Sequence, residues 1–445
     1  MKRIVILGAG ESGIGAALLA QKEGWDVFVS DSGMIKAAYK KELASAKIDF
    51  EEGKHSDDRI LNAALIVKSP GIPEKNEMVK KIRKKRIELI SEIELAFRYK
   101  GESKIVGITG SNGKTTTTAL TYHICKNGGA DCALVGNIGY SFARQVATDP
   151  KPLYIVEISS FQLDDTKMFR PDIAVLTNIT EDHLDRYEYK FENYINSKFR
   201  IIENQGQDDF FIYNDDDEIT KKYLNKFLNS TNPLPISMNH ELPEGAYIVS
   251  EEMHLKWKNE DMEMSIEDFA IKGKHNQYNT MAAGISSAVL GIRKEKIRDA
   301  IQTFEGLEHR MFKVATVRGV EFINDSKATN VNSTWYALES MTKPVILILG
   351  GVDKGNDYSF IKELVKEKVK GIICLGVDNT KIHEALGKDV PFMVNAQSAK
   401  DAVEAAFHFA DKGDVVLLSP ACASFDLFKN YEDRGNQFIK AVKDL

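Results

Sequence analysis

The chain has 445 residues, 43% of them hydrophobic and 28% charged, a composition typical of a folded protein with about three domains. Its formal net charge of -6 argues against nucleic acid or an anionic membrane as the partner, because neither attracts an acidic protein. Small molecules are therefore the expected partners. Four cysteines without metal-ligand spacing exclude a disulfide framework and favour a reducing compartment, so we expect a cytoplasmic protein. Each domain is long enough to bury its own core, so we expect a monomer.

The first segment begins with an apolar strand at Arg3 to Leu7 and the turn Gly8-Ala9-Gly10-Glu11-Ser12-Gly13. An amphipathic helix and a second strand follow, and that strand ends at Ser30-Asp31. This is the dinucleotide-binding fingerprint, with Asp31 placed to bind a ribose hydroxyl. The pattern alone does not distinguish NAD from another diphosphate, because the same strand, turn and helix bind both.

A further strand, Leu65 to Val67, runs into the Pro/Gly turn Lys68 to Pro73. The basic run Lys80 to Arg86 could indicate an anion site. We favour a solvated helix face that is anchored by Ile82 and its apolar neighbours.

The second segment contains a phosphate-binding loop at residues 107–115, Gly-Ile-Thr-Gly-Ser-Asn-Gly-Lys-Thr. It lies between the strand Lys104 to Val106 and a predicted helix over Thr116 to Lys126. The strict pattern G-x-x-x-x-G-K-[ST] fails because Ile108 occupies the first glycine position, so the loop is a variant. Lys114 adds positive charge and Thr115 a hydroxyl for Mg²⁺, which predicts ATP binding.

Polar residues follow two later strands of this segment. Glu157 ends the strand Leu153 to Val156, where a carboxylate could share Mg²⁺ with Thr115. The run Thr177 to Tyr187 follows a strand over Ile173 to Leu176, at the edge where open α/β sheets bind ligands. Within it, His183 lies between acidic residues and is interpreted as functional.

Other features of the second segment are weaker. From about residue 217 to 272 no motif is found, and Asn214 to Glu218 is interpreted as a charged turn, not as a metal loop. Lys198 by itself has the pattern of an exposed helix lysine. Asn276 and Asn279 precede an Ala-rich helix at Met281 to Leu290, so they cap that helix or face adenine.

The third segment again alternates strands with helical stretches. The sequence therefore predicts an α/β protein of three domains: a Rossmann-like N-terminal domain, a central P-loop ATPase-like domain with a parallel sheet, and a Rossmann-like C-terminal domain. We expect the boundaries 1–98, 99–305 and 306–445. Cys422 has no base partner in evidence and is interpreted as a packing residue.

Five motifs together resemble the Mur ligases of peptidoglycan synthesis. They are Thr109 to Thr115, Thr177 to Arg186, His275 to Asn279, Gly306 to Arg310 and Asn324 to Asn330. The closing run Ser419 to Phe438 is similar to the members that add D-glutamate. The match extends from Gly8 to Phe438, apart from residues 219 to 270.

The resemblance implies an ATP-dependent amide ligase that joins D-glutamate to UDP-N-acetylmuramoyl-L-alanine through an acyl phosphate. The implied cofactors are ATP and Mg²⁺ at two sites. The domains would then bind, in order, UDP, ATP and the amino acid, so the first turn would hold UDP and not NAD. The implied partners are these two substrates, with neither nucleic acid nor a membrane.

The resemblance also implies roles for individual residues. Lys114, His183 and Lys198 would be catalytic, with Lys198 carrying an N-carbamate. The metal ligands would be Thr115, Glu157, His183 and Lys198. ATP would contact Gly110, Asn112, Gly113, Lys114, Thr115, Thr116, Asn276, Asn279, Arg310 and Asp325. The two substrates would contact Gly13, Asp31, Ser32, Ser69, Pro70, Gly71, Asn137, Ser159, Gln162, Lys327, Thr329, Lys354, Ser424, Phe425 and Tyr431.

Three other interpretations remain open at this point. Another Mur step or a folyl-glutamate ligase would share every motif except the closing run. An NAD-dependent oxidoreductase fused to an ATPase would use the first turn for NAD. A non-catalytic scaffold would have no need of Lys114, Glu157, His183 and Lys198, all of which are present.

Overall fold

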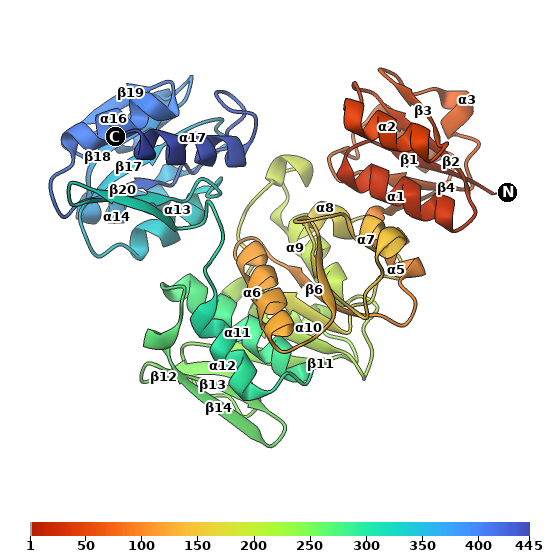
Figure 1. The fold of residues 1–445 in the computed structure, drawn as a ribbon, viewed down its shortest axis with the longest axis horizontal. Coiled ribbons are helices and arrows are strands. Elements are labelled where there is room, and N and C mark those ends of the chain that lie inside the picture. The colour runs from red at the N-terminus through yellow and green to blue at the C-terminus, as the bar shows by residue number, and fades with distance from the viewer. Residues whose placement is uncertain (1) are drawn as a thin grey trace. The chain divides into compact units, whose positions relative to one another are not determined.

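The computed structural model describes residues 2–445, which form two compact units (Figure 1). The first unit extends to Phe269 and resumes at Tyr278–Phe304. The second comprises Ala270–Gln277 and Glu305–Leu445. No helix within residues 2–445 combines the length and the apolar character that a membrane crossing requires.

The first sheet is parallel throughout, with strand order β3-β2-β1-β4-β5. The order reverses between β1 and β4, so the turns after these two strands border one crevice, the place where open α/β sheets bind ligands. The elements are β1 (Arg3–Leu7), α1 (Glu11–Lys22), β2 (Asp26–Asp31), α2 (Ala37–Ser45), β3 (Asp49–Glu52), α3 (Asp57–Ile60), β4 (Leu65–Lys68), α4 (Glu77–Lys84), β5 (Glu88–Ser91) and α5 (Glu92–Tyr99).

The basic run Lys80 to Arg86 was expected to be a solvated helix face, and the structure confirms a helix with an exposed basic face. Helix α4 buries Met78, Val79 and Ile82, while Lys84, Lys85 and Arg86 are exposed. Lys80, Lys81, Arg83 and Lys84 are therefore the exposed face of an amphipathic helix, and Lys85 and Arg86 follow its end.

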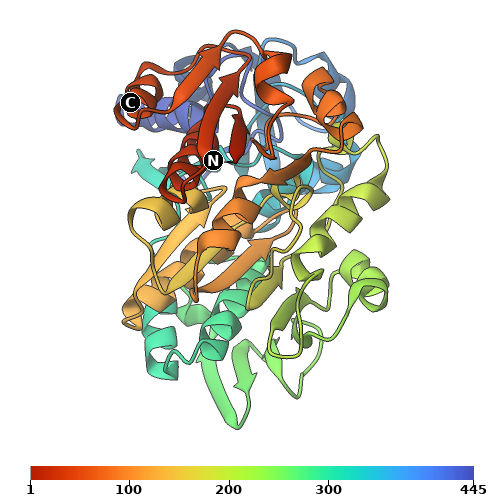
Figure 2. The ribbon, with the colours of Figure 1, turned by 90° about the vertical axis from the view of Figure 1, so that its right-hand side faces the viewer.

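The second sheet has the order β14-β13-β12-β11-β10-β9-β6-β8-β7 and is parallel from β7 to β12 (Figure 1, and Figure 2 from a second side). Strand β6, which leads into the phosphate loop, lies between β8 and β9. The elements are β6 (Lys104–Thr109), α6 (Lys114–Asn127), β7 (Cys132–Gly136), α7 (Phe142–Thr148), β8 (Leu153–Glu157), α8 (Ser160–Leu163), β9 (Ile173–Leu176), η1 (Leu184–Arg186), α9 (Phe191–Phe199), η2 (Arg200–Ile202), β10 (Phe210–Asn214), α10 (Glu218–Phe227), β11 (Asn232–Ser237), β12 (Gly245–Val249), β13 (Glu252–Trp257), β14 (Glu260–Ser265), η3 (Ile266–Asp268), α11 (Lys274–Val289) and α12 (Lys294–Thr303).

The stretch without a motif is well structured. It forms α10 and strands β11 to β14, the last three joined by antiparallel pairing. Met253 and Leu255 on β13 and Met262 and Met264 on β14 are buried, and polar residues alternate with them. The charged turn before α10 is confirmed, since Asp217 caps that helix by accepting from the Thr220 N–H.

The second unit holds a six-stranded sheet of order β15-β16-β20-β17-β18-β19, in which only the β15–β16 pair is antiparallel. This confirms the predicted α/β class with three sheets. The elements are β15 (Phe312–Val317), β16 (Val320–Asn324), α13 (Val331–Glu339), β17 (Val345–Leu349), η4 (Tyr358–Ile361), α14 (Lys362–Lys368), β18 (Val369–Leu375), α15 (Thr380–Leu386), β19 (Met393–Ala396), α16 (Ala399–Phe409), β20 (Val415–Leu418) and α17 (Tyr431–Lys443).

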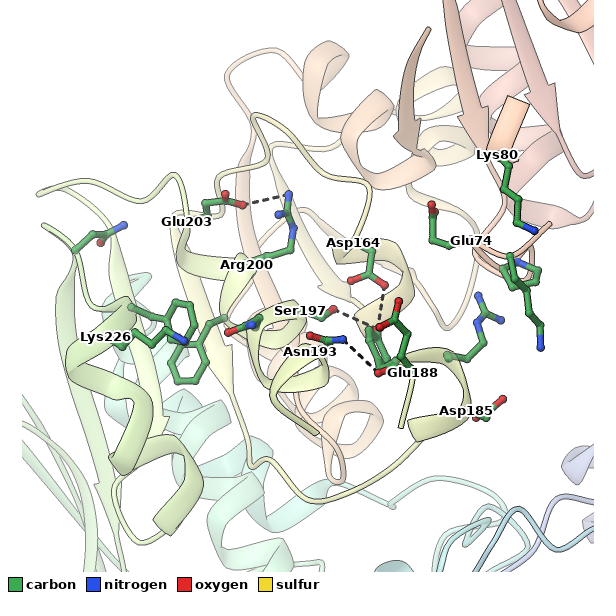
Figure 3. A pocket seen from close by; sticks show the side chains of 18 residues that line it. Glu74, Lys80, Asp164, Asp185, Glu188, Asn193, Ser197, Arg200, Glu203 and Lys226 are labelled. Atoms are coloured by element: carbon green, nitrogen blue, oxygen red, sulfur yellow. Dashed lines mark hydrogen bonds and ion pairs between the residues drawn. The ribbon is translucent and has the colours of Figure 1, made fainter. Parts of the chain in front are cut away.

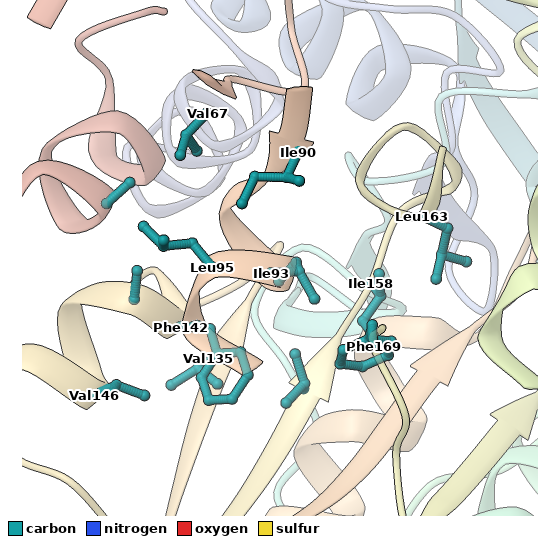
Figure 4. Packing of buried hydrophobic residues seen from close by; sticks show 14 of the residues in the cluster. Val67, Ile90, Ile93, Leu95, Val135, Phe142, Val146, Ile158, Leu163 and Phe169 are labelled. Carbon is teal, nitrogen blue, oxygen red and sulfur yellow. The ribbon is translucent and has the colours of Figure 1, made fainter. Parts of the chain in front are cut away.

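One apolar core joins the first two sheets (Figure 4). Val67 and Ile90 from the first sheet belong to the same cluster as Ile93 of α5 and Phe142 of α7. The Phe142 ring lies edge-on to Tyr154 of β8, with centroids 4.8 Å apart. Because this core is continuous, the first two sheets form a single unit.

All four cysteines are buried and free of disulfides. Cys125 and Cys132 belong to the first unit, and Cys374 and Cys422 to the second. Burial raises the pKa of each thiol, to about 12, 11, 12 and 11 respectively.

Candidate functional site

The phosphate loop connects β6 to α6, and its backbone requires glycine. Gly110 and Gly113 have φ angles of 145° and 83°, and Gly113 is the N-cap of α6. A Cβ atom on Gly113 would lie 2.3 Å from Asn279 Oδ1. Helix α6 begins at Lys114, two residues before the predicted start, so Lys114 and Thr115 belong to its first turn, where backbone N–H groups can bind an anion.

The segment after β9 fixes the shape of this loop. Asn178 accepts from the Ser111 N–H through its carbonyl (2.9 Å) and from the Asn112 N–H through Oδ1 (3.0 Å). Thr177 Oγ1 donates to the Asn112 carbonyl (2.6 Å), and the Thr180 N–H donates to Ser111 Oγ (2.9 Å). The first half of the motif Thr177 to Arg186 is therefore a scaffold for the phosphate loop.

Two lysines meet at one carbonyl oxygen of the loop. Lys114 Nζ and Lys198 Nζ donate to the Gly110 carbonyl at 2.7 and 2.8 Å, and Lys198 also reaches Thr109 Oγ1 at 3.2 Å. Lys198 is only 1% exposed, which corrects its interpretation as a surface lysine. Burial, with the neighbouring charge of Lys114, lowers the pKa of Lys198 well below its ordinary value.

Glu157 ends β8 as a buried carboxylate that is half satisfied. Its Oε1 accepts from Asn137 Nδ2 at 2.7 Å, whereas Oε2 accepts no hydrogen bond from residues 2–445. A buried carboxylate oxygen without a donor is costly unless a cation pairs with it. This donor set therefore fits a hard cation such as Mg²⁺.

His183 has a left-handed backbone, with φ of 53°, an uncommon conformation for a residue other than glycine. Its ring lies edge-on to Phe161, with centroids 5.0 Å apart, and Nε2 is 3.6 Å from Asp182 Oδ2. Ser159 and Gln162 form a capping box at the start of α8, and Gln162 is buried. Their first role is thus to hold the helix that carries Phe161.

A cavity of about 370 Å³ lies at the crevice of the first sheet and brings together five predicted residues, Asp31, Ser32, Ser69, Pro70 and Gly71. Its other lining residues are Gly8, Gly10, Glu11, Ser12, His55 and Ile72, of which the sequence interpretation missed Glu11, Ser12 and His55 as single residues. The x positions of the turn motif were the available signal for Glu11 and Ser12.

Within this first cavity, Asp31 orients the glycine turn. Its two carboxylate oxygens accept from the Ala9 N–H (2.7 Å) and the Gly33 N–H (2.8 Å). Gly13 does not line the cavity. A Cβ atom there would lie 1.8 Å from the Gly8 carbonyl, so this glycine is required for the close approach of α1 to the turn.

The two asparagines near α11 fall in different units. The helix begins at Lys274, seven residues before its predicted start, so both lie within its first two turns. Asn276 Nδ2 donates to the Lys272 carbonyl at 2.8 Å in the second unit. Asn279 Oδ1 accepts from Thr117 Oγ1 at 3.1 Å in the first unit, and thus lies against the phosphate loop.

The remaining predicted residues lie in the second unit. Burial raises the pKa of Asp325 to about 7, and its Oδ2 accepts from Ser419 Oγ at 2.9 Å. Lys327 Nζ lies 3.7 Å from the centroid of the Tyr431 ring. Ser424 is buried, Phe425 is 73% exposed, Lys354 is exposed, and Thr329 and Arg310 are partly buried.

Three family descriptions match successive parts of the chain. Residues 2–91 match "Mur ligase MurD-like, N-terminal domain", residues 108–287 match "Mur ligase middle domain", and residues 309–422 match "Mur ligase, glutamate ligase domain". The UDP-N-acetylmuramoylalanine--D-glutamate ligase of Christiangramia forsetii is 52% identical over 444 residues, and that of Bacteroides fragilis is 53% identical over 446 residues. Both alignments cover 100% of each chain.

The chain belongs to the Mur ligase family. Solved structures agree with this assignment at the level of the fold. A pseudomurein peptide ligase type C from Methanothermus fervidus has a TM-score of 0.63 at 22% identity, and the UDP-N-acetylmuramate-alanine ligase of Thermotoga maritima has 0.63 at 16%. Each comparison covers 100% of both chains.

This Mur ligase also has a buried arginine that the sequence interpretation did not single out. Arg434 on α17 is 1% exposed and donates to the carbonyls of Ser326 (2.8 Å), Cys422 (3.2 Å) and Gly350 (3.5 Å). It therefore holds together three loops of the second unit. The closing motif contained Arg434, but nothing in its local pattern distinguishes it from an exposed helix arginine.

Cys422 of the Mur ligase packs as expected. Its Sγ lies 3.2 Å from the Tyr358 hydroxyl and 3.4 Å from Asn356 Nδ2. Burial raises the pKa of this thiol to about 11, so it is not a thiolate at neutral pH.

Proposed function

We propose that this Mur ligase is an ATP-dependent enzyme that forms the amide bond between UDP-N-acetylmuramoyl-L-alanine and D-glutamate in peptidoglycan synthesis. The observation that carries the proposal is the identity of 52 to 53%, over the whole chain, with curated ligases of that name. The alternatives with NAD chemistry or without catalysis receive no support from these relatives.

In the proposed reaction, a carboxylate oxygen of the substrate attacks the γ-phosphorus of ATP and ADP leaves. The product is an acyl phosphate, whose carbon is then attacked by the amine of D-glutamate, and phosphate departs as the amide forms. Two anions must approach each other in the first step, so charge neutralisation dominates its barrier. Lys114 and the N-terminal turn of α6 supply positive charge where the phosphates would bind.

The magnesium ligands remain proposals that the donor chemistry supports. Thr115 and Glu157 would hold a first Mg²⁺, and the unsatisfied, buried Oε2 of Glu157 is the observation in favour. His183 and Lys198 would lie at a second. Bound Mg²⁺ would reduce the repulsion between carboxylate and triphosphate.

Lys198 fits this scheme as a carbamate. A buried neutral amine can attack CO₂, forming an N–C bond and losing a proton, and the product is an anion with two oxygen ligands. An ammonium in the same position would repel the metal. The support is the burial of Lys198 beside Lys114, which disfavours its charged form.

We assign the three substrates to the three predicted domains. The cavity with Asp31, Ser32, Ser69, Pro70 and Gly71 would take the UDP group, with Gly13 shaping its turn, and Asn137, Ser159 and Gln162 would approach the muramoyl group. ATP would contact Gly110, Asn112, Gly113, Thr116, Asn276, Asn279, Arg310 and Asp325. D-glutamate would contact Lys327, Thr329, Lys354, Ser424, Phe425 and Tyr431. We place this reaction in the cytoplasm and expect a monomer, which light scattering would test.

The deciding experiment measures phosphate release with ATP and UDP-N-acetylmuramoyl-L-alanine. D-glutamate, L-alanine, L-lysine and meso-diaminopimelate are supplied in parallel, and only D-glutamate should support turnover. Equal or greater turnover with another amino acid would replace the proposed substrate. Phosphate release that does not require the UDP substrate would contradict the ligase assignment itself.

A further inference from the structure

Arg186 is the last residue of η1 and of the motif Thr177 to Arg186, and the proposed reaction gives it no role. Its guanidinium donates to the carbonyls of Pro70 (3.1 Å) and Gly71 (3.4 Å). Both of these residues line the 370 Å³ cavity of the first sheet. A side chain of the second sheet's domain thus contacts the backbone of the loop that would hold UDP.

Ile72 of this loop packs against an apolar cluster of the first sheet, whereas the residues that follow it border open space. A second cavity, of about 910 Å³, is lined by the continuation of the loop, Pro73 to Lys75, by α9 and by α10 (Figure 3). Apolar packing at Ile72 and the polar contacts of the loop therefore set its conformation together. Apart from Arg186, Lys68 supplies one of these polar contacts, donating to the Ile72 carbonyl at 2.9 Å.

The other side of Arg186 contacts the catalytic segment. Its guanidinium carbon lies 4.3 Å from the centroid of the Phe161 ring, and Phe161 in turn packs edge-on against His183. The Arg186 N–H also donates to the His183 carbonyl at 2.9 Å. One side chain therefore contacts both the loop of the first cavity and the aromatic ring beside His183.

We infer that Arg186 is a positioning residue. It orders the loop Ser69 to Ile72 for binding of a nucleoside diphosphate, and it couples that loop to the segment that contains His183. This inference rests on the proposed function, because it takes the first cavity as the UDP site. Within the loop, the Ser69 N–H donates to the Leu7 carbonyl and the Ile72 N–H to the Ser69 carbonyl. The two bonds from Arg186 to Pro70 and Gly71 add to this set and fix the central peptide of the loop. Loss of the guanidinium would weaken UDP binding without altering the phosphate loop.

The test titrates UDP into the full-length protein by calorimetry and measures KM for each substrate. Arg186→Ala should weaken UDP binding about tenfold and raise the KM of the UDP substrate similarly, since two charge-assisted hydrogen bonds are lost. The KM for ATP should change less than about twofold. Arg186→Lys keeps the charge but cannot span both carbonyls, so its affinity for UDP should fall about threefold.

The matched control is Lys190→Ala, which removes an exposed positive charge from the same segment. Lys190 Nζ forms an ion pair with Glu188 at 2.9 Å. This variant should bind UDP as the wild type does. Unchanged UDP affinity in a folded Arg186→Ala protein would overturn the positioning role. Equal losses for UDP and ATP would also overturn it, because they indicate general destabilisation. If Arg186→Ala does not fold, unchanged UDP affinity in Arg186→Lys serves as the overturning result. A wild-type protein that turns over with D-glutamate but binds no UDP would refute this inference alone, whereas no turnover at all would refute the proposed function.

Discussion

The first unit contains two glycine turns that follow the same local plan, strand, turn and helix, and that differ in what surrounds them. The turn Gly8 to Gly13 is bordered by the carboxylates of Glu11 and Asp31. In the loop Gly110 to Thr115, two lysines donate to one carbonyl. A buried glutamate, Glu157, ends β8, which lies beside β6 in the sheet. Under the proposed function, backbone geometry would bind phosphate at both turns, and the neighbouring charges would decide which of them carries out chemistry.

Buried ionisable groups near the two turns are also of opposite kinds. Lys198 lies beside the phosphate loop, and burial pushes its pKa down. Glu92, at the start of α5, accepts from the Ala143 N–H, and burial raises its pKa to about 7, with a smaller contribution from Glu11 of the first turn. In both cases burial favours the neutral form, but only the lysine lies where a reactive amine is useful.

The comparison predicts first that Lys114→Ala reduces turnover by about 1000-fold or more, since it removes charge stabilisation at the transferred phosphate. UDP affinity should remain within about twofold, because the first turn does not depend on Lys114. The control Lys126→Ala alters an exposed lysine at the far end of the same helix and should retain activity. Steady-state kinetics and calorimetry measure both. A Lys114→Ala protein that ligates normally would remove the catalytic difference between the turns.

The second prediction is that Lys198→Arg reduces turnover about 100-fold, because arginine keeps the cation and forms no stable carbamate. Lys198→Ala should lose a similar share of its turnover, and added short carboxylates should restore part of it. Wild-type activity should also fall after dialysis into carbonate-free buffer and recover with bicarbonate. Near-normal turnover of Lys198→Arg would rule out the carbamate.

At the first turn, Asp31→Asn should weaken UDP binding about five- to tenfold while the KM for ATP stays the same. The carboxylate accepts from the Ala9 and Gly33 N–H groups, and an amide offers only one acceptor oxygen. Asp26→Asn, at the exposed start of the same strand, is the matched control. The wild-type protein should show no comparable affinity for NAD, and NAD binding as tight as that of UDP would reverse the assignment of this cavity.

The smallest effect on catalysis is expected at Glu92. There the pH dependence of the free energy of unfolding should change instead. With a folded pKa of about 7 against an ordinary value of 4.5, the folded protein binds the Glu92 proton more tightly than the unfolded chain does. The stabilisation is therefore complete below about pH 4.5 and is lost as pH rises through 7, by ~3 kcal/mol at most.

Thermal unfolding at pH 5, 6, 7 and 8 should show this loss in the wild type and a flatter profile in Glu92→Gln. Asp325 titrates in the same window in the other unit, so the difference between the two proteins is the relevant quantity. The exposed Glu102→Gln should follow the wild type. Parallel pH profiles for wild type and Glu92→Gln would show that this buried acid is not the group responsible.

The strand and turn elements that lead into the first cavity and the phosphate loop were predictable because their signals are local. Glycines, a preceding apolar run and a following helical stretch mark both turns in the sequence. The structure gives Gly8, Gly110 and Gly113 a positive φ. Family motifs added the candidate residues. The structure then placed Asp31, Ser69 and Gly71 around one cavity.

Burial depth was not predictable, because it depends on tertiary packing. Lys198 and Arg434 lie on helices whose local patterns resemble exposed faces, yet each is 1% exposed. The strands β13 and β14 are different, because their period-2 burial matches an alternation of apolar and polar residues that the sequence already contains. The early start of α11 at Lys274 was missed because His, Asn, Tyr and Thr in its first turns have low helix propensity, which tertiary contacts override.

The four buried thiols have a practical consequence. Two lie in each unit, and none forms appreciable thiolate in the folded state near neutral pH, so thiol-reactive dyes should modify them only when the surrounding structure opens. The chain therefore carries a built-in reporter of local opening that needs no engineered label. Mass spectrometry of the modified peptides would read the opening of each unit separately, and covalent inhibitors directed at cysteine would find no accessible target in the native enzyme.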